Sequence, residues 1–136
     1  MSFRIVDELL DPILALASVR DPTCGAVASF VGTVRGTSAG RKVVRLEYEV
    51  LETMALRQFQ KMAGEFQRKH GVRHVAIHHR RGTVEVGGVS VVIAVSAERR
   101  RSALTACAEA IEILKKDAPI WKKEVYPDGH VWMEGS

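Results

Sequence analysis

The stretch Leu114-Lys115-Lys116-Asp117-Ala118-Pro119-Ile120-Trp121-Lys122-Lys123-Glu124 joins the end of a predicted helix to the start of a predicted strand. Pro119 disfavours helical geometry at Ala118, so we expect the helix to end there. Four lysines fall within nine residues, and the apolar segment 119–121 separates the two pairs. A mobile basic tail does not need such an anchor, whereas a site that holds cationic groups in place does. The stretch therefore predicts a helix-to-strand junction that presents lysines to an anionic small molecule.

Hydrophobic periodicity predicts the elements on either side of this junction. Residues 89–96 are nearly all apolar and β-branched, which indicates the central buried strand of a sheet. The helix before the junction is expected over residues 99–117. A second long helix is expected from a Thr53 cap to Gly71, with an apolar stripe at Ala55, Phe59, Met62 and Phe66. A shorter helix should run from Asp11-Pro12 to Val19, and strands are expected over 3–6, 25–34, 72–80, 120–126 and 131–133.

The remaining segments complete the predicted architecture. Residues 43–50 alternate between apolar and polar, which predicts a half-buried strand antiparallel to the strand before it. Residues 36–42 are small and polar and predict a mobile loop that orders over a ligand. Residues 82–88 contain three glycines and predict a turn-rich excursion. We therefore expect a single α+β domain over residues 1–136, with an antiparallel or mixed sheet packed by two long helices.

Composition excludes several classes of protein. The chain has 136 residues, 46 % of them hydrophobic and 26 % charged, which is ordinary for a globular domain. No apolar run approaches the roughly 20 residues of a membrane span, and acidic residues follow the N-terminus too early for a signal peptide. We expect a cytoplasmic protein with Cys24 and Cys107 reduced. The net charge of +4 permits nucleic acid as a partner but does not demand it.

Lys115 is the first candidate for chemistry. Helical spacing places it in the middle of an apolar stripe that we expect to be buried, formed by Leu104, Cys107, Ala108, Ile111 and Leu114. Two interpretations remain open at this point. The lysine extends from the core to solvent at the helix end, or it lines a cavity, where desolvation would make it a base or nucleophile.

Other basic residues are weaker candidates. Lys122 and Lys123 are neighbours on a predicted strand and must face opposite sides, so at most one of them belongs to a given pocket. Arg99-Arg100-Arg101 opens the long helix, where cations oppose the helix dipole unless they bind an anion. Arg35 follows a strand, and an exposed arginine is the default there. His74 and His78 share a strand face without further ligands, and no P-loop or G-x-G-x-x-G motif is present, so we expect neither a metal nor a cofactor.

Blocks of sequence spread over most of the chain resemble the large, catalytic subunit of molybdopterin synthase. The resemblance extends from about Gly25 to Trp132. It is carried by 25–27, 30–35, 46–49, Met54-Ala55, His79-Arg80-Arg81-Gly82, Val95-Ser96, Leu114-Lys115 and 118–124.

The resemblance implies a fold and an activity. It implies an α/β-hammerhead-like fold and a sulfurtransferase of molybdenum cofactor biosynthesis. The substrate would be cyclic pyranopterin monophosphate, and the sulfur would come from the thiocarboxylated C-terminal glycine of a small ubiquitin-like subunit. This chain ends in Gly135-Ser136 and not in a diglycine, so we expect it to be the acceptor side. The family's arrangement implies a homodimer within a heterotetramer, with no nucleic acid and no membrane.

The resemblance also implies roles for individual residues. The family's two catalytic lysines correspond to Lys115 and Lys122. Substrate binding is implied for Thr33, Val34, Arg35, Arg99, Arg100, Lys123 and Glu124. The family has histidine where this chain has Arg99, which leaves an anion-binding role there and removes a general acid–base role. The alternatives are a non-catalytic paralogue that binds a ubiquitin-like tail or an anion, and, less favoured, an RNA-binding protein with too few aromatics for base stacking.

Overall fold

Strand β8 (Val89–Ala97) lies inside the larger of two sheets, as its apolar sequence predicts. In the computed structural model, which describes residues 1–134, the strand order of this sheet is β1-β6-β8-β2. Strand β1 (Ser2–Val6) runs parallel to β6 (Val72–Arg80), whereas β6 and β2 (Ala26–Thr33) both run antiparallel to β8. The predicted mixed sheet is therefore confirmed.

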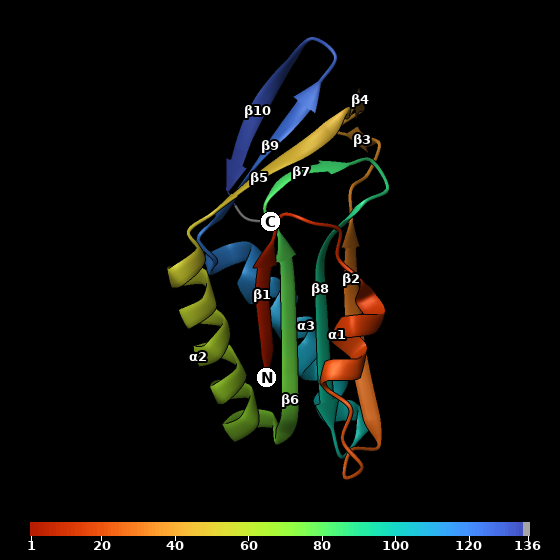
Figure 1. Ribbon diagram of the computed structural model, residues 1–136, viewed down its shortest axis with the longest axis vertical. Helices are drawn as coiled ribbons and strands as arrows, with labels where there is room; N and C mark the ends of the chain where they lie inside the picture. The colour runs from red at the N-terminus through yellow and green to blue at the C-terminus, as the bar shows by residue number, and fades with distance from the viewer. Residues whose placement is uncertain (135–136) are drawn as a thin grey trace.

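A second four-stranded sheet stands beyond one end of the first (Figure 1). Its order is β10 (Gly129–Glu134), β9 (Ile120–Tyr126), β5 (Arg45–Val50) and β7 (Gly82–Glu85), with antiparallel pairing throughout. The predicted pairing of 43–50 with the preceding strand is wrong, because β5 pairs with β7 and β9 instead. The segment expected to be only a turn-rich excursion supplies β7. Alternation in a sequence identifies the buried face of a strand but not its neighbours.

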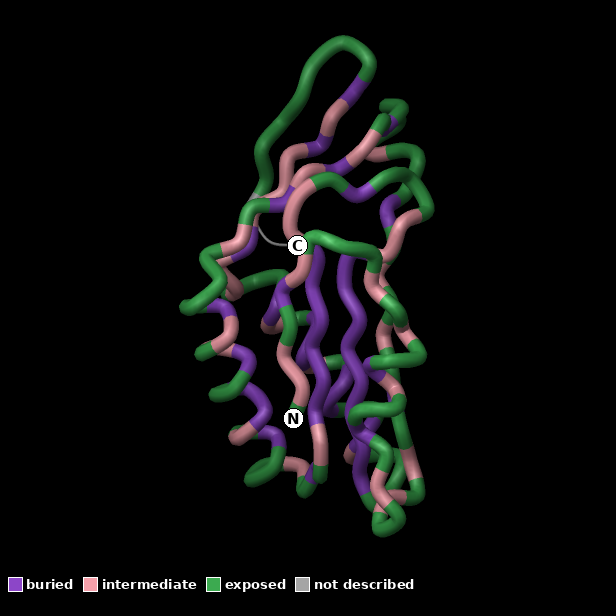
Figure 2. Tube along the Cα trace, viewed as in Figure 1, coloured by how far each residue is buried: buried purple, intermediate pink, exposed green. Residues whose placement is uncertain are grey.

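Helices cover both faces of the larger sheet. The two long helices, α2 (Glu52–His70) and α3 (Arg100–Asp117), cover one face, and the short α1 (Pro12–Ser18) covers the other (Figure 1). Alternation along β8 explains this arrangement, because successive side chains enter two separate apolar clusters. Ile93 and Val95 pack with Leu114 of α3, whereas Val92 and Ala94 pack with Ala15 of α1. Figure 2 shows β6 and β8 buried along most of their lengths.

The ends of the helices test the predicted start and stop signals. Gly71 ends α2 in the left-handed conformation with φ of 68°, and Ala118 ends α3 in an extended conformation before the proline, as predicted. The Asp11 side chain accepts a hydrogen bond from the backbone N–H of Ile13. The predicted Thr53 cap is wrong, because α2 begins at Glu52 and Leu51 occupies the cap position.

Two further expectations concern loops and chain ends. Residues 36–42 were expected to form a loop, and they contain a short hairpin of β3 (Thr37–Ser38) and β4 (Arg41–Lys42). The C-terminal Gly135-Ser136 lies outside the described residues. Within residues 1–134, no helix combines the length and the apolar character needed to cross a membrane.

His79 is a buried polar residue at the end of β6. Its side chain is 0 % exposed, and its ring packs edge-on against Tyr48 with the centroids 5.1 Å apart. Nδ1 lies 2.7 Å from the Arg80 carbonyl oxygen, to which it donates, and Nε2 has no hydrogen-bond partner among the described residues. Burial disfavours the charged imidazolium and lowers the pKa of His79 to about 4.

We expect the His79 ring to make the protein acid-sensitive. Above about pH 6.5 the ring is neutral in both states, but as the pH falls toward 4 only the unfolded chain binds the proton. The free energy of unfolding should fall by up to about 3 kcal/mol over that window from this group alone. In urea unfolding between pH 7 and pH 4, the free energy of unfolding of His79→Gln should depend less on pH than that of the wild type. The matched change at exposed His130, His130→Gln, should leave the wild-type dependence intact, and equal slopes for all three proteins would refute the assignment.

Candidate functional site

A cavity of about 300 Å³ lies where the two sheets meet the C-terminal end of α3. The larger sheet contributes the end of β2 and the start of β8, and the smaller sheet contributes β5 and β9. The β3–β4 hairpin and its flanks form part of the rim. The lining residues are Phe30, Val31, Gly32, Thr33, Arg35, Thr37, Val43, Leu46, Tyr48, Ser90, Val91, Lys115, Lys122 and Glu124.

Strand β9 delivers two of the charged groups because its side chains alternate. Lys122 and Glu124 share the face of β9 that lines the cavity. Their partners across the ladder are Tyr48 opposite Lys122 and Leu46 opposite Glu124, and both of these line the cavity as well. The register between β5 and β9 therefore builds one wall of the site.

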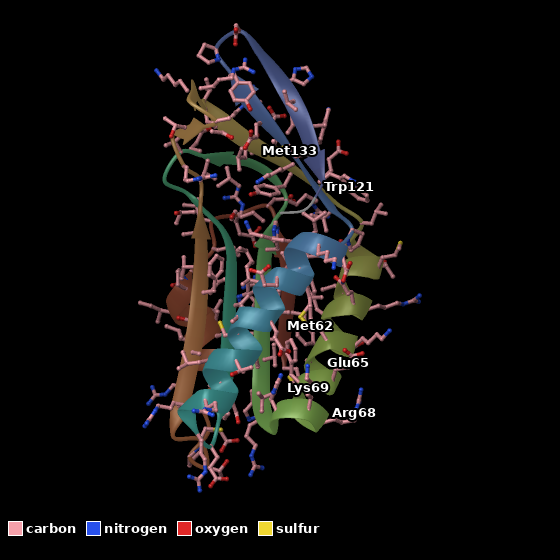
Figure 3. All side chains as sticks on the ribbon, turned by 180° about the vertical axis from the view of Figure 1, so that it is seen from behind. Met62, Glu65, Arg68, Lys69, Trp121 and Met133 are labelled. Carbon is pink, nitrogen blue, oxygen red and sulfur yellow. The ribbon has the colours of Figure 1, made fainter. Side chains whose placement is uncertain are left out.

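Lys123 lies on the other face of β9, as alternation requires. Its Nζ is 3.3 Å from Glu47 Oε1 and 5.5 Å from the centroid of the Trp132 ring. Figure 3 shows the junction from behind, with Trp121, another residue of this face, labelled near the end of α3. Lys123 was expected to bind substrate, and the structure places it outside the cavity in an ion pair.

Lys115 lines the cavity from the last turn of α3. It does not sit in the middle of a buried stripe, as the helical spacing suggested, because Leu104 and Ala108 are exposed and Lys115 itself is exposed. The stripe that is buried is rotated and consists of Ala103, Ala106, Cys107, Ala110, Ile111 and Leu114. Lys115 thus stands at the edge of the core, where its amine reaches the cavity without being desolvated in the core.

Thr33 and Arg35 reach the cavity from the end of β2, but Val34 between them does not. Val34 is buried and exchanges two backbone hydrogen bonds with the 87–88 turn, of 3.0 Å to Gly88 and 2.8 Å from Gly87. This pairing fixes the direction in which its two neighbours point.

Gly32 allows the strand to approach β8 closely beside the cavity. A Cβ atom at this position would lie 2.7 Å from Val91 Cγ1, which is too close for any side chain, and the register of β2 against β8 shifts just after it. The bulge or close backbone approach that the sequence predicts is confirmed.

Arg99 and Arg100 lie at the opposite end of α3. Together with Gly25, Glu98 and Arg101 they line a separate cavity of about 500 Å³. The rise of an α-helix places Arg100 about 22 Å from Lys115 along the axis. Within one chain, these arginines therefore do not join the site that contains the two lysines.

The electrostatics of the main cavity favour an anion. Burial lowers the pKa of Lys122, the nearby charges of Lys115 and Arg35 lower it further, and Glu124 opposes the shift. Within the part of the chain that the structure describes, none of these three cations has a carboxylate within 4.0 Å. Three like charges that repel one another would be stabilised by a phosphate or carboxylate placed between them.

Several lining residues were not singled out by sequence reasoning. Tyr48 shares a strand face with apolar residues and Ser90 lies within an apolar strand, and both line the cavity. Burial raises the pKa of the Tyr48 hydroxyl. Tyr48 belonged to an alternating apolar face and Ser90 to an apolar run, so the only available signal was a hydroxyl inside a hydrophobic pattern. Across residues 1–134, no group of three His, Cys, Asp or Glu side chains is placed to hold a metal ion.

Comparison with known proteins identifies the family. The profile described as "MoaE protein" matches residues 5–117. The chain belongs to the MoaE family. A molybdopterin synthase catalytic subunit from Oryza sativa is 47 % identical over 134 residues, covering 96 % of this chain and 69 % of its own. The human protein described in the same words is 43 % identical over 114 residues, covering 84 % of this chain and 61 % of its own.

Solved structures of MoaE-type proteins agree with this assignment. The X-ray structure of molybdopterin synthase from Staphylococcus aureus superposes with a TM-score of 0.91 at 35 % identity, covering 95 % of this chain and 94 % of that one. A complex of subunits 1 and 2 of molybdopterin-converting factor from Helicobacter pylori gives a TM-score of 0.80 at 25 % identity, covering 96 % and 88 %. The predicted α+β fold and the family resemblance are both confirmed.

We expect the cavity to bind inorganic pyrophosphate through its unpaired cations. Lys122→Met should weaken binding by at least about tenfold, because a hydrogen bond to a charged group contributes roughly 1.5–3 kcal/mol. Isothermal titration calorimetry at low ionic strength is the measurement, and added salt should weaken binding. Lys123→Met is the matched control, since this neighbour faces away from the cavity. Equal losses for the two variants would show that binding is not located there.

Proposed function

We propose that this protein is the catalytic subunit of a molybdopterin synthase. It transfers sulfur from the thiocarboxylated C-terminal glycine of a small ubiquitin-like subunit to cyclic pyranopterin monophosphate, and this forms the dithiolene of molybdopterin. The observation that carries the proposal is the convergence of Arg35, Lys115 and Lys122 on one cavity of a MoaE-family fold.

The charges of the site suit this reaction. The acceptor carries a cyclic phosphate and the donor carries an anionic thiocarboxylate, so two anions must approach each other. Cationic side chains in a half-buried cavity reduce that repulsion and stabilise the negative charge that develops during transfer. Arg35 and Thr33 lie on one side of the cavity and hold the phosphate and pterin in this proposal. Lys115 activates or protonates the reacting centre, and Lys122 orients the substrate or stabilises the developing charge.

The partner in this proposal is the small sulfur-carrier subunit. The Helicobacter pylori relative is described as a protein–protein complex of two subunits of the converting factor, which supports a heteromeric assembly for this chain. The C-terminal tail of the small subunit would enter the cavity as an extended peptide that carries the thiocarboxylate.

A homodimer of the large subunit gives Arg99 and Arg100 a place in the same reaction. Helix α3 holds them about 22 Å from Lys115 within one chain, and a packed helix does not bend far enough to close that gap. We propose that Arg99 and Arg100 of a second copy of the chain bind the substrate phosphate at this cavity, within a heterotetramer. Arg99, where the family has histidine, contributes charge there and no proton transfer.

The remaining expectations belong to the same proposal. We propose that residues 1–136 act as one catalytic domain in the cytoplasm. Cys24 and Cys107 are both free, and burial raises the pKa of Cys107 to about 11, which keeps its thiol protonated at neutral pH.

The proposal predicts that Lys115→Ala abolishes most of the activity. Purified protein is mixed with thiocarboxylated small subunit and cyclic pyranopterin monophosphate, and molybdopterin is assayed by mass spectrometry. We expect Lys115→Ala to reduce the rate about 100-fold or more, the scale of a lost acid–base group.

The neighbouring Lys116→Ala is the control for this assay, because Lys116 is exposed and lies outside the cavity, and it should retain a near-wild-type rate. If the wild type bound the small subunit but made no product, the protein would be a non-catalytic paralogue and not a synthase. Full activity in Lys115→Ala would show that Lys115 is a surface lysine with no part in catalysis.

A further inference from the structure

Tyr126 lies beyond the charged wall of the cavity, two residues past Glu124 at the end of β9. It follows Lys122 and Glu124 on the same face of β9, is 7 % exposed, and does not line the cavity itself. Its hydroxyl donates a 2.7 Å hydrogen bond to Oε1 of Glu124. This bond holds a carboxylate that is itself only 5 % exposed.

The position of the Glu124 carboxylate matters because Lys122 is its neighbour on that face. Residues two apart on a strand are about 6.6 Å apart, within reach of a long side chain. Among residues 1–134, Glu124 nevertheless makes no ion pair within 4.0 Å. The hydrogen-bond partner of the carboxylate is Tyr126, on the side of Glu124 away from Lys122 along the strand, and Lys122 has no carboxylate within 4.0 Å among the described residues.

A cation–π contact with Arg41 fixes the Tyr126 ring. The Arg41 guanidinium lies over the ring at 3.8 Å from its centroid, and Arg41 Nη2 donates a 2.9 Å hydrogen bond to Asp128 Oδ1. Arg41 belongs to the β3–β4 hairpin, whose Thr37 lines the cavity. Arg41 therefore covers the ring and ties the hairpin at the rim to the turn after β9, and the hydroxyl is directed at Glu124.

We propose that Tyr126 is a positioning residue whose hydroxyl holds the Glu124 carboxylate away from Lys122, so that the Lys122 amine is free to meet the reacting atoms. The role of that amine in sulfur transfer rests on the function proposed above. Without the hydroxyl, a buried carboxylate that has lost its donor pairs with a neighbouring cation, and Lys122 is its neighbour on the cavity face, because leaving it unpaired is costly. Lys122 would then be neutralised by Glu124 rather than by substrate.

The test is Tyr126→Phe, which removes the hydroxyl and keeps the ring under Arg41. Lysine side-chain NMR of the free protein measures the pKa of Lys122. The Lys122 signal is assigned as the one that is missing from the spectrum of Lys122→Met. We expect the pKa of Lys122 to rise by about one unit in Tyr126→Phe, since a new ion pair favours the charged form. In the sulfur-transfer assay kcat should fall about tenfold, and its pH profile should move in the same direction as the titration.

A double-mutant comparison separates positioning from simple damage. Glu124→Gln removes the carboxylate, so adding Tyr126→Phe to it should produce no further change in the Lys122 titration. Arg45→Gln is the matched control, because Arg45 lies on the other face of the sheet. In this variant the pKa of Lys122 should equal the wild-type value. An unchanged or lowered Lys122 pKa in Tyr126→Phe would overturn the proposal. Because the titration needs no substrate, it decides the role of Tyr126 even if the wild type makes no product.

Discussion

The change of direction at Pro119 is the constraint on which the site depends. The proline ends α3 at Ala118 and the chain enters β9 at once, with Ile120 fully buried. Lys115 in the last turn of the helix and Lys122 on the strand are thereby brought to one cavity from two different elements. The buried Leu114 and Ile120 anchor the two sides of the turn in the same core, so the lysines are held by packing and not by their own contacts.

Among the described residues, the three cations of the site, Arg35, Lys115 and Lys122, have no carboxylate within 4.0 Å. Some other basic residues do have carboxylate partners: Arg81 pairs with Asp7 and Glu52, and Lys123 pairs with Glu47. At the cavity the one buried carboxylate, Glu124, is bonded to a tyrosine instead. Unpaired like charges lower stability through their mutual repulsion, and an anionic ligand relieves that repulsion. Destabilising charges at a ligand site are a common form of preorganisation.

The smaller sheet contributes more to the site than its size suggests. Its strands β5 and β9 supply one wall, while the larger sheet supplies the packing that holds α3 in place. The β3–β4 hairpin is tied to the smaller sheet through Arg41, which contacts Tyr126 of β9 and Asp128 of the turn after it. The two sheets share one apolar cluster, which makes the cavity at their junction a property of the whole fold.

Sequence alone determined the elements whose signals are local. The strands 72–80 and 120–126, the long helices, the Gly71 and Pro119 stops and the opposite orientations of Lys122 and Lys123 follow from periodicity and from proline and glycine chemistry. The MoaE family was also readable from short blocks of sequence. Only the tertiary structure decided that β5 pairs with β9, that Lys115 stands at the edge of the core, and that Arg99 and Arg100 lie far from it in one chain. These depend on which distant segments meet, because alternation fixes the face of a strand but carries no information about its neighbour.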